Sequence, residues 1–160
     1  MEDINNSYLS FKVGAEFFAV HASRVEEIRE YQEPRHMPEV TTFMKGVIDH
    51  RDEIIPVIDT GLKFGMKPIE VTMQTCIVII NVKRKDSDTT FKVGILTDSV
   101  TDVFEAEMKD FKSVEIDYSP EYIQATYQLD DSFYLVLNLD EVFSKNEIVE
   151  LSNILREIKK

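Results

Sequence analysis

The stretch GVIDHRDEIIPVIDTGLKFG, residues 46–65, decides the fold class of this chain. It contains a short apolar strand at residues 47–48, a charged hairpin tip, a second apolar strand at residues 54–58, and an aspartate, Asp59, that begins a helical turn. The tip holds Arg51 between the two apolar strands, and no catalytic group stands at a strained or buried point. This pattern favours a surface that recognises another protein over a site that transforms a small molecule.

The composition limits the classes of partner. A chain of 160 residues is long enough for one domain, or for two very small ones that share a core. The formal net charge of −12 argues against nucleic acid, which needs a dense basic patch, and against an anionic membrane surface. The single cysteine, Cys76, cannot form an internal disulfide, and the acidic start MEDINN is unlike a signal peptide. No apolar run approaches the roughly 20 residues of a membrane helix. We therefore expect a cytoplasmic protein without membrane insertion.

Most of the chain predicts short strands separated by polar turns. Leu9, Phe11 and Val13 alternate with more polar residues, which is the two-residue period of a half-buried strand. Polar loops are predicted at residues 83–90 and 130–132. Many short strands at this spacing are typical of an all-β barrel or sandwich. The predicted strands are residues 8–13, 17–20, 47–49, 54–58, 75–82, 91–96, 123–129 and 133–139.

The C-terminal segment has a helical pattern instead. Ser144 with Glu147 three residues later forms a capping box, which starts a helix. This predicts an amphipathic helix over residues 144–160, which either closes the end of a barrel or binds a partner. Its apolar residues recur at helical spacing and are Ile148, Leu151, Ile154, Leu155 and Ile158.

The two halves of the chain resemble each other. Each has a strand that leads to a Val-x-x-Ile or Val-x-x-Val segment, and later a strand, an aspartate and a helical turn, as in IIPVID and YLVLNLDEVF. We interpret this as a degenerate duplication, with a first barrel at residues 7–72 and a second at residues 73–143. Each barrel is near the size at which a lone core is marginal, so the two are expected to pack together and leave a groove between them.

The Val-x-x segments allow two readings. Val25 with Ile28, and Val100 with Val103, stand at the same place in each half, just after a strand. They either fill the core beneath a short helical turn or line the groove between the barrels. In the second case the apolar face of a partner helix would fit against them.

Patterns for catalysis or metal binding are absent from the sequence. His21, His36 and His50 have no partner at a metal-ligand interval and are expected at the surface or in turns. The chain has no GxGxxG, GxxxxGK[ST] or GxSxG motif, and Cys76 lies in an apolar run where a thiol is a poor nucleophile. The sequence therefore predicts no catalytic residue, no metal and no cofactor.

Carboxylates around the hairpin leave one alternative open. Asp49, Asp52, Glu53 and Asp59 could form an acid pair or a hard-metal site, as in a β-barrel enzyme or a small-molecule binder. Asp59, at the start of a helical turn, fits a helix N-cap better.

The segments quoted above resemble the CheW family, the adaptor proteins of bacterial chemotaxis, over almost the whole chain. Residues 46–65 resemble the family signature G-V-I-N-x-R-G-x-x-x-P-V-[IV]-D-L-x-x-x-[FL]-G. YLSFKVGAEFFAV resembles the opening strand–turn–strand, RVEEIREY the V-x-E-I segment, and FKVGILTDSVTDV and YLVLNLDEVF the second-half elements. Asp49, His50 and Asp52 depart from the signature, which has Asn, Leu and Gly there, and a family Gly near Ala125 is also absent.

The resemblance implies two tandem five-stranded SH3-like barrels around a shared core, without catalysis. It implies an adaptor that couples the cytoplasmic hairpin of methyl-accepting chemoreceptors to the regulatory domain of the chemotaxis histidine kinase, recruited to membrane-associated receptor arrays. A CheW-like module of a non-chemotaxis pathway, such as motility or gene regulation, is the alternative. The positions that match receptor contacts are Val25, Glu27, Ile28, Arg51, Val100 and Val103. The positions that match the kinase-facing surface are Met44, Gly46, Ile54 and, in the second barrel, Val114.

Overall fold

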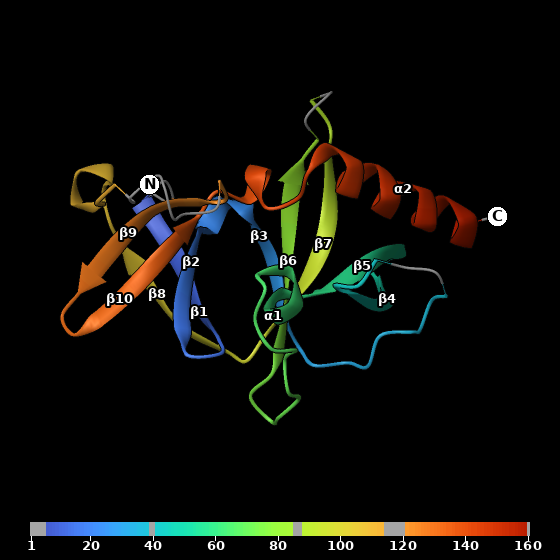
Figure 1. Cartoon of the computed structure of the whole chain (residues 1–160), viewed down its shortest axis with the longest axis horizontal. Coiled ribbons are helices and arrows are strands. Elements are labelled where there is room, and N and C mark those ends of the chain that lie inside the picture. Colours follow the sequence, from blue (N-terminus) through green and yellow to red (C-terminus); the bar gives the residue numbers. More distant parts are fainter. Residues whose placement is uncertain (1–5, 39–40, 85–87, 114–120, 160) are drawn as a thin grey trace.

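The computed structural model describes residues 6–38, 41–84, 88–113 and 121–159, and it contains two five-stranded sheets and a C-terminal helix (Figure 1). The strands are β1 (Ser7–Val13), β2 (Glu16–His21), β3 (Val25–Glu30), β4 (Met44–His50), β5 (Glu53–Asp59), β6 (Cys76–Lys83), β7 (Thr90–Thr97), β8 (Ser99–Glu105), β9 (Ile123–Leu129) and β10 (Ser132–Leu137). The helices are α1 (Thr60–Lys63) and α2 (Lys145–Lys159), with short 3-10 turns η2 (Ala22–Arg24), η3 (Met108–Asp110) and η4 (Leu139–Glu141).

The two sheets share one topology. Sheet A has the strand order β8-β1-β2-β10-β9, and sheet B has the order β3-β6-β7-β5-β4. The centre of each sheet is a hairpin, β1–β2 in sheet A and β6–β7 in sheet B. The second strand of each hairpin makes a parallel pairing with its other neighbour, β2 with β10 and β7 with β5. Figure 1 shows sheet A on the left and sheet B on the right. This equivalence agrees with the duplication that the sequence predicts, and the all-β fold class with a C-terminal helix is confirmed.

The sheets do not follow the predicted division at residue 72. Sheet A takes the hairpin β1–β2 from the first half of the chain and β8, β9 and β10 from the second. Sheet B takes β3, β4 and β5 from the first half and the hairpin β6–β7 from the second. The halves thus exchange their leading hairpins. A repeat in the sequence identifies which strands of the two halves are equivalent. Because the remaining strands of both halves offer equivalent edges for pairing, the repeat does not reveal which half a hairpin joins.

The hairpin β1–β2 lies between two cores. Leu9 and Phe11 belong to a large apolar cluster that includes strands of both sheets and part of α2. Tyr8, on the other face of β1, belongs to a smaller cluster inside sheet A, where its ring stacks on Phe104 at 5.8 Å. Ser10 is also fully buried, and its hydroxyl group hydrogen-bonds Thr101 and Asp102 of β8. The strand is therefore buried on both faces, whereas the alternating pattern predicts a half-buried one.

β3 is an edge strand that the sequence pattern missed. Its pairing with β6 skips Glu26, so that Val25 lies opposite Ile80 and Ile28 lies opposite Val78. An extra residue of this kind is a β-bulge, and it brings two residues that are three apart in sequence onto the same face of a sheet.

β8 carries the same irregularity at the edge of sheet A. Its pairing with β1 skips Thr101, so that Val100 lies opposite Phe11 and Val103 opposite Leu9. The three-residue spacing of both Val-x-x segments is therefore produced by a bulged strand, and the reading as a short helical turn is wrong.

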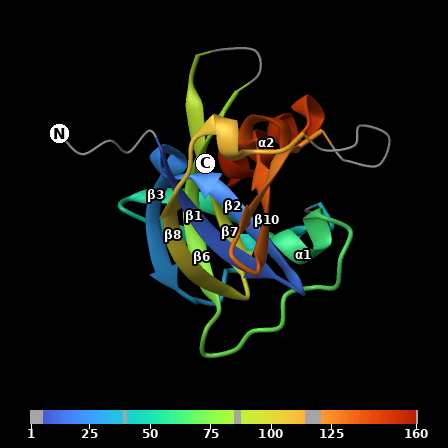
Figure 2. The same ribbon diagram turned by 90° about the vertical axis from the view of Figure 1, so that its left-hand side faces the viewer.

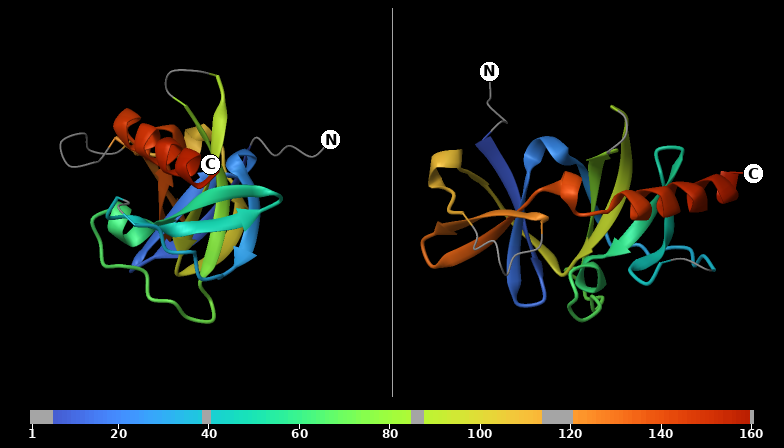
Figure 3. Two further views of the ribbon diagram at one scale, coloured as in Figure 1. Left: turned by 90° about the vertical axis from the view of Figure 1, so that its right-hand side faces the viewer. Right: turned by 45° about the horizontal axis from the view of Figure 1, so that its top comes forward.

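Helix α2 packs on sheet B. The Ser144 N–H donates to Glu147 Oε1 at 2.7 Å, and the Glu147 N–H donates to Ser144 Oγ at 3.1 Å, which confirms the predicted capping box. Ile148 and Leu151 are buried in the large cluster, and α2 contacts β5 (Figure 3). This packing favours the reading in which the helix covers the end of a barrel. The side chain of Ile158 lies outside the described residues.

An ion pair joins the 3-10 turns η2 and η4. Arg24 donates to the Asp140 carboxylate at 2.5 and 3.2 Å and to the Asn81 carbonyl at 3.0 Å. Asp140 also accepts from the backbone N–H of Lys83 at 3.1 Å. The hydrogen bonds from Arg24 outweigh partial desolvation and hold the pKa of Asp140 below its ordinary value.

We expect Asp140→Asn to lower the free energy of unfolding by about 1 kcal/mol at neutral pH. A carboxyl whose pKa is lowered by folding adds stability above its unfolded pKa, and this stability is lost as the pH falls through the lower pKa of the folded state. When the pH is lowered from neutral to below about 4, urea unfolding should therefore show a smaller decrease in the free energy of unfolding for the variant than for the native chain. Asp131→Asn, on an exposed hairpin tip, is the control. Equal acid sensitivity of Asp140→Asn and the native chain would contradict the expectation.

Candidate partner-binding site

The hairpin between β4 and β5 turns through Arg51 and Asp52, whose φ angles are 49° and 68°. His50 pairs with Glu53 across the turn. Positive φ at both central residues is the geometry of a two-residue type I′ turn, which matches the twist of the strands. Aspartate adopts this conformation at modest cost. Asp52 therefore takes up the backbone conformation that a glycine would otherwise supply, and its departure from the family signature leaves the turn intact.

Arg51 is exposed and paired with β3. Its side chain is 71% exposed, and Nη2 donates to Glu27 Oε1 at 2.7 Å. This hydrogen bond raises the pKa of Arg51 and lowers the pKa of Glu27. Two of the predicted receptor-binding residues are thus brought together as a solvated ion pair. Such a pair contributes little to stability and is accessible to a partner.

His50, the neighbour of Arg51, is buried, so the predicted surface or turn position is wrong for this histidine. Its Nε2 lies 2.7 Å from Glu26 Oε2, while Glu26 Oε1 lies 3.3 Å from Lys92 Nζ. Lys92 also hydrogen-bonds Glu53. Desolvation acts to raise the pKa of Glu26, but hydrogen bonds to His50 and Lys92 outweigh it and hold that pKa below its ordinary value.

These contacts link the two edge strands of sheet B. Glu26 and Glu27 come from β3, and their partners His50 and Arg51 lie at the end of β4. Arg29 of β3 also donates to the Asp49 carbonyl at 3.0 Å. Side chains thereby hold the edges of the sheet together as a barrel. The sequence did not identify this network, because its members are remote in the chain and no motif joins them.

The apolar residues of the Val-x-x segments divide into two classes. Val25 and Val100 are half-buried and pack against the large cluster, whereas Ile28 and Val103 are 44% and 58% exposed. Figure 2 shows β3 and β8 on the same side of the molecule. Val103 shares its face of sheet A with Leu9, which belongs to the cluster common to both sheets. The first residue of each segment therefore contributes to the core, and the last is accessible.

The predicted kinase-facing residues differ in exposure. Met44 is 4% exposed and belongs to the core. Gly46 is buried with φ of 151°, and a Cβ there would lie 2.1 Å from the Arg35 carbonyl oxygen. Glycine is therefore required at this position of β4, where the backbone of Arg35 packs closely against the strand. Ile54 is half-buried, and Val114 lies outside the described residues. Among these residues Ile54 offers the accessible surface.

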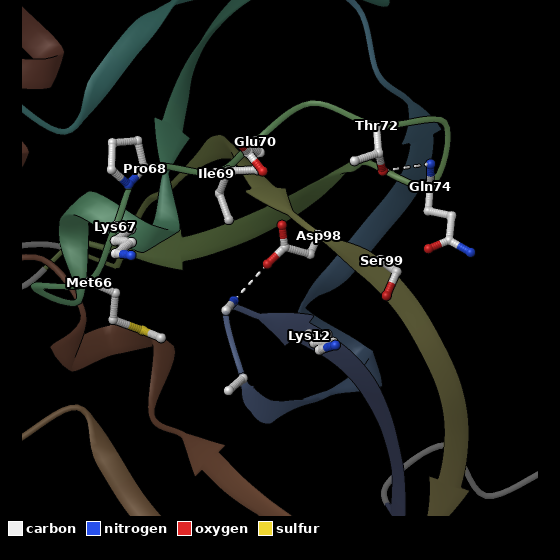
Figure 4. A pocket seen from close by; sticks show the side chains of 12 residues that line it. Lys12, Met66, Lys67, Pro68, Ile69, Glu70, Thr72, Gln74, Asp98 and Ser99 are labelled. Carbon is white, nitrogen blue, oxygen red and sulfur yellow. Dashed lines mark hydrogen bonds between the residues drawn. The ribbon is translucent and has the colours of Figure 1, made fainter.

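A cavity of about 970 Å³ lies away from these residues, between the β1–β2 turn and residues 66–74 (Figure 4). The Gly14 N–H donates to Asp98 Oδ2 at its edge, at 2.6 Å. Its lining combines apolar side chains, such as Met66 and Ile69, with charged side chains of both signs. None of the predicted receptor or kinase positions lines it. The sequence did not reveal this cavity because it forms between segments far apart in the chain.

The hairpin carboxylates do not converge on one site. Asp59 is fully buried and lies at the opposite end of β5 from Asp52. It accepts the N–H of Leu62 at 3.1 Å and that of Ile69 at 3.1 and 3.2 Å, which confirms the predicted helix N-cap. Within the described ranges, no group of three His, Cys, Asp or Glu side chains is placed to hold a metal ion. No helix in this part of the chain has the length and apolar composition needed to cross a membrane.

Comparison with known proteins places this chain in a family. A family model described as a CheW-like domain matches residues 7–147. The probable chemotaxis protein CheW of Rhizobium etli is 28% identical over 142 residues, which cover 87% of this chain and 88% of that protein. The chemotaxis protein CheW of Treponema pallidum is 28% identical over 155 residues, which cover 91% of this chain and 86% of that protein.

The fold has a counterpart among crystal structures. The scaffolding protein TtCheW from Thermoanaerobacter tengcongensis matches with a TM-score of 0.78 at 20% sequence identity, covering 91% of this chain and 92% of that one. The family match runs from the start of β1 past the end of β10, so it includes all strands of both sheets. This chain therefore belongs to the family of CheW-like proteins.

Proposed function

We propose that this chain is a coupling adaptor of bacterial chemotaxis, which joins the cytoplasmic hairpin of chemoreceptors to the regulatory domain of a chemotaxis histidine kinase. The match to the CheW-like family over residues 7–147 carries the proposal. The adaptor acts by binding and performs no catalysis of its own. It works in the cytoplasm and is recruited to receptor arrays at the membrane through its partners.

The receptor surface that we propose comprises the two bulged edge strands and the adjoining hairpin tip. Ile28 and Val103 offer accessible apolar contacts, one on each sheet. Arg51 and Glu27 offer a solvated ion pair on the Ile28 side, since Glu27 precedes Ile28 on β3. A receptor helix can place apolar residues against the first pair and polar groups against the second. Val25 and Val100 support this surface from the core side.

The kinase surface that we propose lies on the β4–β5 part of sheet B. Ile54 provides accessible apolar surface there, while Met44 and Gly46 hold β4 in position from within. Val114 stays a proposed second kinase contact. Because Ile54 and Arg51 lie on the same hairpin, the two surfaces are close, and the Arg51 variant below tests whether they are separable.

Reconstitution with purified partners tests the function. The chain should co-sediment with receptor cytoplasmic fragments and with the kinase together, and receptor control of kinase autophosphorylation should require it. Binding of one partner without the other would contradict the coupling role. The protein alone should neither hydrolyse ATP nor retain a metal after purification, and turnover that is lost on substitution of a carboxylate would contradict the non-enzymatic role.

Arg51→Ala should weaken receptor binding by about 1–2 kcal/mol if Arg51 is a binding hot spot. The folding midpoint should change little, since exposed substitutions usually fall within about 0.5 kcal/mol. Kinase binding should survive. Arg35→Ala is the matched control, because Arg35 is also an exposed arginine paired with a carboxylate, Asp49, at 3.2 Å. Isothermal titration with each partner measures both affinities, and equal loss of both partners would show that the hairpin is structural or that the surfaces overlap.

A further inference from the structure

A small basic cavity lies between the end of β6 and helix α2. Its volume is about 150 Å³, and among the described residues its lining includes Arg84, Lys145 and Arg156 and no acidic side chain. The chain as a whole carries a net charge of −12. The charge around this cavity is therefore opposite in sign to the net charge of the chain.

The described carboxylates do not neutralise these cations. In the described part of the chain none of the three forms an ion pair, although Arg24, Arg51 and Lys92 all do. Arg84 is nevertheless held in place, since Nη1 donates to Ser152 Oγ at 2.8 Å and its guanidinium carbon lies 5.1 Å from the centre of the Phe91 ring. Positive side chains that line one cavity attract an anion, and a bound anion would provide the partner that they lack among the described residues.

The donor set indicates which anion fits. The Ser152 hydroxyl accepts from Arg84, so its own proton is free to donate. Arg84 keeps further N–H groups, and Lys145, Asn153 and Arg156 add donors around the same cavity. Many donors without a carboxylate suit an anion with several acceptor oxygens. The volume is below the roughly 300–1,000 Å³ of cavities for drug-sized ligands, so it suits one small group.

We propose that this cavity binds a phosphate-type oxyanion, either a free phosphate ion or a phosphoryl group carried by a larger molecule. The inference goes beyond the coupling role and does not depend on it. Five of the seven lining residues lie past residue 147, where the family match ends, so most of the site lies outside that match.

A phosphate titration of the isotope-labelled full chain, followed by NMR at constant ionic strength, tests the proposal. Saturable shifts are expected at residue 84 and in α2. Lys145→Gln combined with Arg156→Gln should weaken binding at least tenfold, without the packing loss that an Arg84 variant would bring. Lys109→Gln, which removes an exposed cation near sheet A, should leave the affinity unchanged. Receptor and kinase binding should persist in the double variant, which separates this site from the coupling role.

A phosphoserine peptide and its unphosphorylated form distinguish the two sources of phosphate. Saturation by inorganic phosphate identifies the free ion, and saturation by the phosphopeptide alone identifies a carried phosphoryl group. The proposal is overturned if shifts are unsaturable and spread over all exposed cations, if the double variant binds as the native chain does, or if a glutamate-rich peptide binds more tightly than either phosphate probe.

Discussion

Ile28→Lys and Val103→Lys are each expected to weaken binding of the receptor hairpin about a hundredfold while the protein stays folded. Both side chains are already exposed, so a lysine at either position can keep its ammonium group in water in the free protein. In the complex that ammonium would face an apolar helix without a partner, at a cost of about 3 kcal/mol, or roughly a hundredfold in Kd. Fluorescence anisotropy with a labelled receptor hairpin, beside thermal melting of each variant, measures both effects.

A matched control lies on helix α2. Val149 is 47% exposed there, and Val149→Lys makes the same chemical change on an element outside β3 and β8, so receptor affinity should not change. Val25→Lys and Val100→Lys are poorer tests, because those side chains pack against the core and their loss should lower the melting temperature too. The receptor surface is refuted if either exposed variant binds like the native chain, since one hairpin must touch both sheets.

Residues 1–72 on their own are expected to be unfolded, losing the whole folding free energy of about 5–15 kcal/mol. In this fragment the hairpin β1–β2 lacks both neighbours in sheet A, β8 and β10. Strands β3 and β5 lack β6 and β7 in the same way. Neither sheet can form, and the large cluster that both halves build would be exposed. Circular dichroism with thermal melting should show no cooperative transition.

The complementary fragment provides the control. Residues 73–160 should also be unfolded alone, and an equimolar mixture of the two fragments should recover strand content and a cooperative melt, because the hairpins can exchange between them. Cooperative unfolding of monomeric residues 1–72, with stability near that of the whole chain, would show that the first half folds independently.

Several strands were predictable because they obey local rules. Period-two alternation and β-branched runs located β1, β2, β5, β6, β7, β9 and β10, and a capping box located α2. The bulged strands β3 and β8 were missed, since an extra residue changes the two-residue period to a three-residue spacing that resembles a helix. The exchange of hairpins was missed because pairing between remote strands leaves no mark on local sequence.

The candidate site was predictable only in part. The sequence placed Arg51 at a hairpin tip, and the family resemblance grouped it with Glu27, which the structure brings to 2.7 Å. Burial of His50 depends on Glu26, twenty-four residues away in the chain, and no pattern connects the two. Val25 packs against the large cluster whereas Ile28 is 44% exposed, and the spacing alone does not encode which of the two contributes to the core.

Because each half of the chain completes the sheet of the other half with its hairpin, the topology is that of a domain-swapped dimer formed within one molecule. Residues 64–75 connect the halves and let the second fold back to complete the first. If this connection were too short to turn back, β6–β7 of one molecule would complete sheet B of another, and two chains would close into one symmetric particle with the same strand pairings. The length of a single connecting segment thus sets the stoichiometry of the folded unit.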